Sequence, residues 1–456
     1  MIRAMDIEIS QPFETVVATF GGEEPFAVEG VKALIRLHGQ PLGYLELPST
    51  TTQAELEEQI SREFGQQITE HLRRDKVPLD LLDCSPVEML AFATGLPGWQ
   101  PACQVEEARL LAHAPLITVV ICTHNRAKEA VNSAKILLNQ NYPNYELLIV
   151  DNASSDNEVE RLVTREFAQV PQVRFVIEER KGLSWARNRG IFAARGEIIA
   201  FTDDDVIADP GWLSALWKNF SEGTHIACVT GMVVASELDT ETQLLCEQYA
   251  NFNKGFERRA FDNHIAEIGY PYLAGQFGTG GNMAFRRSFL LKIGGFDGRL
   301  GTGMPSCGGE DLDIFFRTIK GGGTIIYEPA AIIRHAHWRE YPVMLGRMEN
   351  YGKGLTAFLA KSVFANPLRL FQLLWLMPYG FYYLTSKKSR KNKNRSLNFP
   401  KELSRAEWRG MLYGPWTFVQ SCLRARAFTR QFGKQPLYPV AAESFPVYPQ
   451  DEVLTR

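Results

Sequence analysis

The feature that most constrains the fold is a series of short apolar segments separated by helix-like segments in the middle of the chain. The segments "LITVVICT" (116–123), "YELLIVD" (145–151) and "EIIAFT" (197–202) each have the length of a buried strand. Between the first two, "AKEAVNSAKILLNQ" (127–140) has the apolar spacing of an amphipathic helix. Apolar strands joined by helices predict an α/β fold, with a parallel-rich sheet covered on both faces.

Polar side chains follow these predicted strands directly. Ligands of open α/β sheets bind beyond the carboxyl ends of the strands, so residues at these positions are candidates for one shared binding site. They are Thr123, Asn125, Arg126, Asp151, Asp203, Asp204 and Asp205.

Three consecutive aspartates at the end of a buried strand repel one another, and this repulsion needs compensation. A divalent cation supplies it, since Mg²⁺ and Mn²⁺ favour oxygen ligands and commonly bind through carboxylates together with substrate phosphates. The alternative is a solvated loop in which Asp209 caps a helix that begins at Pro210. A cap at Asp209 would not explain how the repulsion between Asp203, Asp204 and Asp205 is compensated.

A second acidic pair lies in "CGGEDLDIFFRTIKGGG" (307–323), which predicts a glycine-led loop, a short helix and a glycine stop. Glu310 and Asp311 fall in the first turn, where the helix dipole favours ionised carboxylates. An ionised carboxylate at the edge of a cleft can act as a general base. An ordinary interaction with the helix dipole is the other interpretation.

The segment "IIRHAHWRE" (332–340) contains two histidines that are two residues apart. In a strand, His335 and His337 would face the same side. One of them could complete a metal site, and neutral imidazole suits Mn²⁺ better than Mg²⁺. A purely structural role is the alternative.

Together, these motifs resemble an inverting glycosyltransferase of family 2, over about residues 116–340. The segments that carry the resemblance occur in the family's order and precede Glu310-Asp311; they are "VVICTHNRAKEA", "LLIVDNASSD", "GLSWARNRGIFAARGEIIAFTDDDV" and "GTGGNMAFRRSFLLKIGGFD". The resemblance implies a GT-A (Rossmann-like) domain that binds a nucleotide-diphospho-sugar.

The resemblance also implies the role of each site residue. Residues expected to bind the nucleotide-sugar are Thr123, Asn125, Arg126, Asp151, Arg187, Asp203 and Asp204. Asp205 would be the principal metal ligand, with Asp203 beside it and His337, ahead of His335, as an extra ligand. Asp311 would deprotonate the acceptor hydroxyl, with Glu310 next to it.

The function implied is metal-dependent transfer of a sugar from a UDP-, GDP- or dTDP-linked donor to a saccharide, lipid-linked or protein acceptor, as in polysaccharide or glycolipid biosynthesis. Processive relatives carry a Q-x-x-R-W motif, whereas "FQLLWL" (371–376) lacks the arginine, so a non-processive enzyme is expected. Two alternatives remain open. One is a catalytically inactive nucleotide-sugar-binding or assembly module. The other is a sugar nucleotidyltransferase, although "THNRAKEA" (123–130) lacks the glycine-rich loop expected there.

The pattern divides the chain into three regions. Residues 1–113 predict a small α+β domain of unknown role, with two short strands within 31–48. Residues 116–340 form the glycosyltransferase-like domain, and residues 341–456 predict a mainly helical region. In that last region an apolar, aromatic stretch (363–384) precedes "SKKSRKNKNR" (386–395), which has six basic residues in ten. This pairing suits an anionic membrane surface, and helices packed on the catalytic domain are the alternative.

Charge, cysteine content and the first residues of the chain indicate the expected binding partners and the cellular compartment. A formal net charge of -3 argues against nucleic-acid binding. The seven scattered cysteines contain no CxxC pair, which favours free thiols in a reducing compartment over disulfides or a structural zinc site. The first residues, "MIRAMDIEISQPFE", lack the apolar core of a signal peptide. The protein is therefore expected in the cytoplasm, with peripheral attachment to the cytoplasmic membrane face as an extension.

Overall fold

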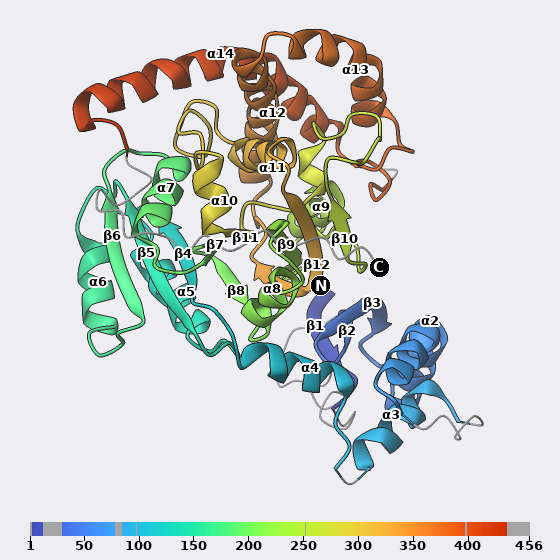
Figure 1. Ribbon diagram of the computed structural model, residues 1–456. Helices are drawn as coiled ribbons and strands as arrows, with labels where there is room; N and C mark the ends of the chain where they lie inside the picture. Colours follow the sequence, from blue (N-terminus) through green and yellow to red (C-terminus); the bar gives the residue numbers. More distant parts are fainter. Residues whose placement is uncertain are drawn as a thin grey trace, which may run out of the picture.

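The computed structural model describes residues 2–11, 30–77, 84–96, 98–250, 252–396 and 399–435. Figure 1 shows a small N-terminal sheet with its own helices, a large central sheet with helices on both faces, and long C-terminal helices packed across one end. This is a mixed α/β, GT-A-like architecture with the small N-terminal sheet and the helical C-terminal region that the pattern predicts.

The N-terminal module is built on three strands, β1 (Ile2–Glu8), β2 (Gly30–Leu37) and β3 (Gln40–Pro48). The hairpin of β2 and β3 is the predicted pair, and β1 adds a parallel strand beside β2 that was not predicted. Helix α2 (Gln53–Arg74) begins with a capping box between Thr52 and Glu55 and buries an apolar stripe of every fourth residue against the sheet. Helices α3 (Pro86–Gly95) and α4 (Ala102–Leu111) then lead to the central domain.

The central sheet has the strand order β10-β12-β9-β11-β7-β4-β5-β6, with β8 paired to β12. Strands β7, β4, β5 and β6 are parallel, as predicted, whereas β11 runs antiparallel between β7 and β9. The strands are β4 (Ile117–Thr123), β5 (Tyr145–Asn152), β6 (Val173–Glu178), β7 (Ile198–Asp203), β8 (Val206–Ala208), β9 (Ile226–Ala235), β10 (Arg259–Phe261), β11 (Asn282–Arg286) and β12 (Thr324–His335).

Helices cover both faces of this sheet because its strands are apolar on both sides. Along β4, Val119 and Ile121 belong to one core cluster and Val120 belongs to the other. The first cluster includes α5 (Ala127–Leu137), α6 (Glu158–Glu166) and α8 (Trp212–Phe220). The second includes α7 (Leu183–Ala193), α10 (Arg287–Lys292) and α11 (Glu310–Lys320). Helix α9 (Glu241–Ala250) and the short 3-10 helix η1 (Ala274–Gln276) lie in the connections.

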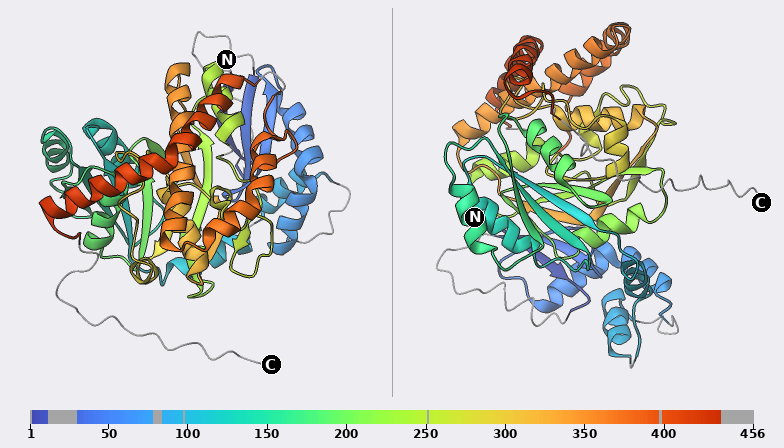
Figure 2. Two further views of the ribbon diagram at one scale, coloured as in Figure 1. Left: turned by 90° about the horizontal axis from the view of Figure 1, so that it is seen from above. Right: turned by 60° about the vertical axis from the view of Figure 1, so that its left-hand side comes forward.

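Three helices form the C-terminal region, α12 (Tyr341–Ala365), α13 (Arg369–Thr385) and α14 (Lys401–Phe432). Figure 2 shows the long α14 running across the end of the central domain beside α12. Glycines let these two backbones touch: a Cβ atom on Gly410 would lie 1.9 Å from the carbonyl oxygen of Glu349, and one on Gly352 would lie 2.0 Å from that of Glu407. None of the helices in the described ranges is long and apolar enough to cross a membrane.

Helix α12 also contacts the start of α11. Gly309, which has a φ of +85° at the N-cap of α11, lies so close to α12 that a Cβ atom would be 2.3 Å from the Gly354 carbonyl oxygen. One turn further along α11, the Asp313 carboxylate pairs with the Lys361 ammonium of α12. The C-terminal helices therefore brace the helix that begins with Glu310 and Asp311.

Ion pairs join the N-terminal module to the central domain. Arg36 Nη1 of β2 lies 2.6 Å from Asp209 Oδ2, and Lys32 Nζ lies 3.0 Å from Glu247 Oε2 of α9.

The prediction that Asp209 caps the following helix needs correction: the N-cap residue of α8 is Gly211, whose N–H donates to Asp209 Oδ1. Asp209 lies two residues before that cap, and its carboxylate is shared between the Gly211 amide and the Arg36 guanidinium.

We expect Gly410→Ala to lower the free energy of unfolding by about 1–3 kcal/mol, because the added methyl forces α12 and α14 apart. Gly346→Ala, in the open part of α12, is the matched control and should be neutral or stabilising by up to about 1 kcal/mol. Denaturant unfolding of both variants measures the difference. Equal stabilities would contradict the close backbone contact.

Candidate active site

A cavity of about 1820 Å³ opens at the carboxyl end of β7 and is walled by all three regions of the chain. The N-terminal module contributes Lys32 and Tyr44, and the C-terminal helices contribute apolar side chains such as Met377 and Phe381. The central domain supplies the acidic groups. The predicted site residues that line this cavity are Thr123, Arg126, Arg187, Asp203, Asp204, Asp205, Glu310 and Asp311.

Asp204 is the inward-facing member of the aspartate triplet. Its carboxylate accepts hydrogen bonds from Thr123 Oγ1 and from Arg126 Nη1, both at 2.7 Å, and its side chain is 8% exposed. Burial raises the pKa of Asp204 to about 7, although the Thr123 hydroxyl and the Arg126 charge oppose the shift. These contacts fix the turn between β7 and β8, and with it the two neighbouring aspartates.

Asp203 and Asp205 face the cavity, with side chains that are 39% and 30% exposed. Asp205 accepts a hydrogen bond from Arg126 Nη1 at 2.9 Å, and its Oδ1 lies 3.5 Å from His335 Nε2. Burial raises the pKa of Asp203; the nearby Arg187 charge lowers it and the Asp205 charge raises it further. Two carboxylates therefore converge on the cavity beside an imidazole.

The two histidines have different neighbours because β12 ends at His335. His337 lies beyond the strand, where the two-residue alternation no longer applies, and its Nε2 is 2.8 Å from Glu247 Oε1. His335, in contrast, lies beside Asp205, with its Nε2 3.5 Å from Asp205 Oδ1. The buried Nδ1 atoms of both histidines have no hydrogen-bond partner among the described residues. The structure thus differs from the predicted preference for His337: the histidine next to the aspartates is His335.

The donor set around Asp205 fits a divalent cation. Two carboxylates, of Asp203 and Asp205, and the imidazole of His335 supply oxygen and nitrogen atoms that suit Mn²⁺, and also Mg²⁺ through the carboxylates. The His335 nitrogen available to such an ion is Nε2, which faces Asp205 Oδ1 at 3.5 Å.

The second acidic pair occupies the first turn of α11, as predicted, and Arg187 links it to the aspartates. Arg187 Nη1 lies 3.2 Å from Glu310 Oε1, and Nη2 lies 3.9 Å from Asp203 Oδ1. Burial and the neighbouring Asp311 charge raise the pKa of Glu310 to about 7, while Arg187 opposes the rise. Arg187 is only 3% exposed, so its guanidinium serves as a buried bridge between the two acidic groups.

A glycine turn passes between the two acidic groups. A Cβ atom on Gly281 would lie 2.6 Å from Asp203 Oδ2, and one on Gly280 would lie 3.3 Å from Asp311 Cβ. The carbonyl oxygen of Gly280 accepts a hydrogen bond from Arg187 Nη2 at 2.9 Å. Only residues without a side chain allow this close approach.

Two residues predicted to bind the nucleoside instead tie neighbouring turns together. Asn125 Oδ1 accepts a hydrogen bond from the Ser155 amide at 2.8 Å, and Asp151 accepts one from the Ser154 hydroxyl. Within the described residues, neither Asn125 nor Asp151 lines the cavity. Their contact with a nucleoside stays a prediction.

Other cavity residues were not singled out by the sequence. Asn152 Oδ1 accepts a hydrogen bond from the Gly182 amide at 2.8 Å; its place directly after Asp151 at a strand end was an available signal. Lys254 also lines the cavity, and burial lowers its pKa to about 8. Lys32 and Tyr44 come from a separate module, and no local pattern could have placed them here.

The family model described as "Glycosyl transferase family 2" matches residues 118–294, from β4 through α10. The chain contains a family 2 glycosyltransferase domain. Such a domain is a glycosyltransferase (EC 2.4), which transfers a sugar from a nucleotide-sugar donor. The predicted family, enzyme class and α/β architecture are confirmed.

Relatives of this chain are named for different acceptors. A glucosyl-dolichyl phosphate glucuronosyltransferase of Haloferax volcanii is 26% identical over 224 residues, covering 48% of this chain and 68% of the relative. Polypeptide N-acetylgalactosaminyltransferase 12 of Mus musculus is 27% identical over 266 residues, covering 54% of this chain and 43% of the relative. The chain therefore spans about two thirds of the archaeal relative and less than half of the mouse one.

Among solved structures, a mannosyltransferase from Pyrobaculum calidifontis in complex with GDP-Man and Mn²⁺ is 19% identical, with a TM-score of 0.40. The match covers 73% of this chain and 83% of that one.

We expect Glu310→Gln to flatten the pH dependence of stability of this glycosyltransferase. With its pKa raised from 4.5 to about 7, folded Glu310 keeps a proton that the unfolded chain has released, so the wild-type free energy of unfolding falls as pH rises through this interval. Glutamine does not titrate, so the part of the slope that comes from Glu310 should disappear, while the part from Asp204, whose pKa is also raised to about 7, remains. Denaturant unfolding at pH 5 and pH 8 measures the difference between the two proteins. The exposed Glu129→Gln is the control, and an equal slope in wild type and Glu310→Gln would contradict the buried protonation.

Proposed function

We propose that this protein is an inverting, metal-dependent, non-processive glycosyltransferase that moves a sugar from a nucleoside-diphosphate donor to a lipid-linked acceptor. The observation that carries the proposal is that Asp203 and Asp205, on one side, and Asp311, on the other, line a single cavity. Arg187 lies between the two sides, where it pairs with Asp203 and with Glu310, the neighbour of Asp311. Asp203 and Asp205 suit the donor diphosphate and its ion, and Asp311 suits the acceptor hydroxyl.

Asp205 and Asp203, with His335, would hold Mn²⁺ or Mg²⁺ on the donor side. When bound, such an ion would supply positive charge to the leaving diphosphate. The chain's own contribution is orientation: Thr123 and Arg126 fix Asp204, and this keeps the adjacent carboxylates pointing into the cavity. Arg126, Thr123, Asn125 and Asp151 would form the nucleoside end of the donor site, and Arg187 would stabilise the diphosphate only through its effect on Asp203.

Asp311 is the proposed general base. The acceptor oxygen forms a bond to the anomeric carbon as its proton passes to the Asp311 carboxylate, and the bond from that carbon to the diphosphate oxygen breaks. Attack from the α11 side, opposite a diphosphate held by β7, inverts the configuration. Glu310 stays paired with Arg187 and is a positioning residue for Asp311.

The acceptor end of the cavity favours a lipid-linked substrate. Its wall is formed by apolar side chains of α13 and α14, including Leu376, Met377, Phe381 and Trp408. Met377 and Phe381 are also exposed on the outer surface, so the cavity and the apolar exterior are continuous. The Haloferax relative is named for a dolichyl-phosphate substrate, which supports the same class of acceptor. A protein acceptor, as in the name of the mouse relative, is the alternative.

The outer surface of α13 and α14 suits attachment to the cytoplasmic face of an anionic membrane. Large apolar side chains are exposed there, among them Phe371, Trp375, Phe381, Leu412, Tyr413, Trp416 and Leu423. The basic run after α13 is divided. Lys391 pairs with Glu407, Arg390 pairs with Glu267 and Arg395 stacks on Tyr249, whereas Lys387, Lys388 and Lys393 are exposed. Each exposed cation near such a surface contributes about 1 kcal/mol.

Calorimetric titration and product analysis with two variants test the catalytic proposal. UDP, GDP and dTDP are each titrated with Mn²⁺ and again with excess EDTA, and one of them should bind only with the metal. Asp205→Ala should lose this binding. Asp311→Asn should keep it but lower the rate of transfer by about 10²–10⁴-fold, because the acceptor hydroxyl loses its base.

Asp239→Asn, outside the cavity, is the matched control and should behave as wild type. Undiminished transfer by Asp311→Asn would refute the base, and metal-independent nucleotide binding would refute the ion site. The same experiments distinguish the two alternative functions. Release of pyrophosphate would indicate nucleotidyl transfer, and nucleotide binding without any turnover would indicate a binding module.

For the membrane proposal, we expect the full-length protein to co-sediment with phosphatidylserine vesicles at low salt and to be released at high salt. Trp375→Asp and Trp416→Asp, whose indoles are 73% and 62% exposed, should each weaken binding by about tenfold or more, since burial of a large apolar side chain is lost. The control is Phe92→Asp, an exposed apolar residue of α3. Failure of the wild-type protein to co-sediment would refute the attachment.

A further inference from the structure

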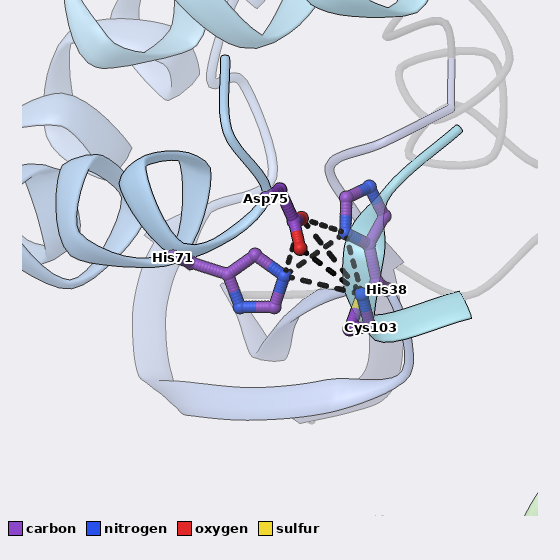
Figure 3. Close-up of side chains that lie close together, drawn as sticks. All are labelled: His38, His71, Asp75 and Cys103. Atoms are coloured by element: carbon purple, nitrogen blue, oxygen red, sulfur yellow. Dashed lines mark hydrogen bonds and ion pairs between the residues drawn. The ribbon is translucent and has the colours of Figure 1, made fainter. Parts of the chain in front are cut away.

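Four side chains with metal-ligating atoms converge inside the N-terminal module, apart from the cavity. They come from three separate elements: His38 from the tight turn between β2 and β3, His71 and Asp75 from the end of α2, and Cys103 from the first turn of α4. Figure 3 shows one atom of each residue pointing to a common centre. All four ligand atoms lie within 4.8 Å of one another.

The distances between these atoms are short and even. His38 Nδ1 lies 3.0 Å from His71 Nε2 and 3.2 Å from Asp75 Oδ2, and His71 Nε2 lies 3.1 Å from the same oxygen. Cys103 Sγ lies 3.5 Å from each imidazole nitrogen and 3.8 Å from Asp75 Oδ2. Each of the four atoms is therefore close to the other three.

This spacing is that of the corners of a tetrahedron around zinc. Zinc bonds of about 2.0–2.1 Å to nitrogen and oxygen and about 2.3 Å to sulfur separate the ligand atoms by about 3.3 Å, or about 3.6 Å where sulfur is one of the pair. The observed separations follow the same order, with the pairs that include sulfur longer than the rest.

Hydrogen bonds alone account poorly for the arrangement. Asp75 Oδ2 would need an N–H group from each imidazole, and the two donating nitrogens, of His38 and His71, would then face each other at 3.0 Å. A cation at the centre satisfies all four atoms at once. The side chains of His38 and Asp75 are 1% and 2% exposed, so water has little access to either.

The surroundings also resemble those of a built site. The other oxygen of Asp75, Oδ1, accepts a hydrogen bond from the Cys103 amide at 3.1 Å, which orients the carboxylate as outer contacts orient metal ligands. Helix α4 buries none of its own residues, yet it leads from the module to β4. A bond through Cys103 would anchor the start of this helix, whereas its apolar contact with the central domain comes from Leu111 at its end.

We propose that His38, His71, Asp75 and Cys103 bind a structural zinc ion, which ties the β2–β3 turn, α2 and α4 into one unit. All four positions are taken by protein atoms, as in closed, non-catalytic zinc sites. The absence of a CxxC pair favoured free thiols, but only one ligand of this site is a cysteine, so the spacing of cysteines could not reveal it.

Metal analysis of the full-length protein, expressed with zinc and dialysed, tests the site. We expect about one zinc per chain in wild type and in Asp205→Ala, whose substitution lies in the other proposed ion site. Cys103→Ala and His38→Ala should lose this zinc. Cys84→Ala, a half-buried cysteine of the same module outside the cluster, is the matched control and should keep it.

Cobalt substitution gives a readout that does not depend on the variants' stability. The cobalt-loaded wild-type chain should show the near-ultraviolet band of a cobalt–thiolate bond and the intense visible bands of tetrahedral cobalt. Wild-type protein without zinc, a cobalt spectrum without the thiolate band, or zinc retained in full by Cys103→Ala would each overturn the proposal. None of these results bears on glycosyl transfer, because the readout is metal content.

Discussion

The arrangement of the catalytic cavity depends on one buried guanidinium group. Arg187 is held at 3% exposure between Asp203 at the end of β7 and Glu310 at the start of α11, and it also donates to the Gly280 carbonyl. Without this cation, the half-exposed carboxylate of Asp203 and the buried carboxylate of Glu310 would face each other, and the cost of an uncompensated charge would fall mainly on Glu310. The glycine turn and both acidic groups can therefore share one cavity only because Arg187 lies between them.

Much of the central domain could be predicted because its signals are local. Apolar runs identified β4, β5 and β7, and polar residues immediately after them identified Thr123, Arg126 and Asp203–Asp205 as cavity residues. What escaped prediction depends on contacts between distant segments. The pairing of Arg36 with Asp209, the entry of Lys32 into the cavity and the choice of His335 over His337 each follow from tertiary packing. The periodicity of a single segment contains no information about such neighbours.

The glycosyltransferase domain does not form its cavity alone. Lys32 and Tyr44 close one side from the N-terminal module, and α13 and α14 close another with apolar side chains. Lys32 also pairs with Glu247, which in turn contacts His337, so a chain of polar contacts runs from the small sheet to the end of β12. The two flanking regions are thus parts of the cavity wall as well as of the scaffold.

The contact between Gly354 and Gly309 has a consequence for how such a protein can diversify. Two backbones meet there without side chains between them, one in a C-terminal helix and one directly before the acidic pair of α11. A recombination event that replaced the C-terminal helices with those of another enzyme would have to bring a matching 308–309 loop with them. The segment that must be exchanged as a whole is therefore larger than the helices themselves, and it includes the loop directly before Glu310 and Asp311.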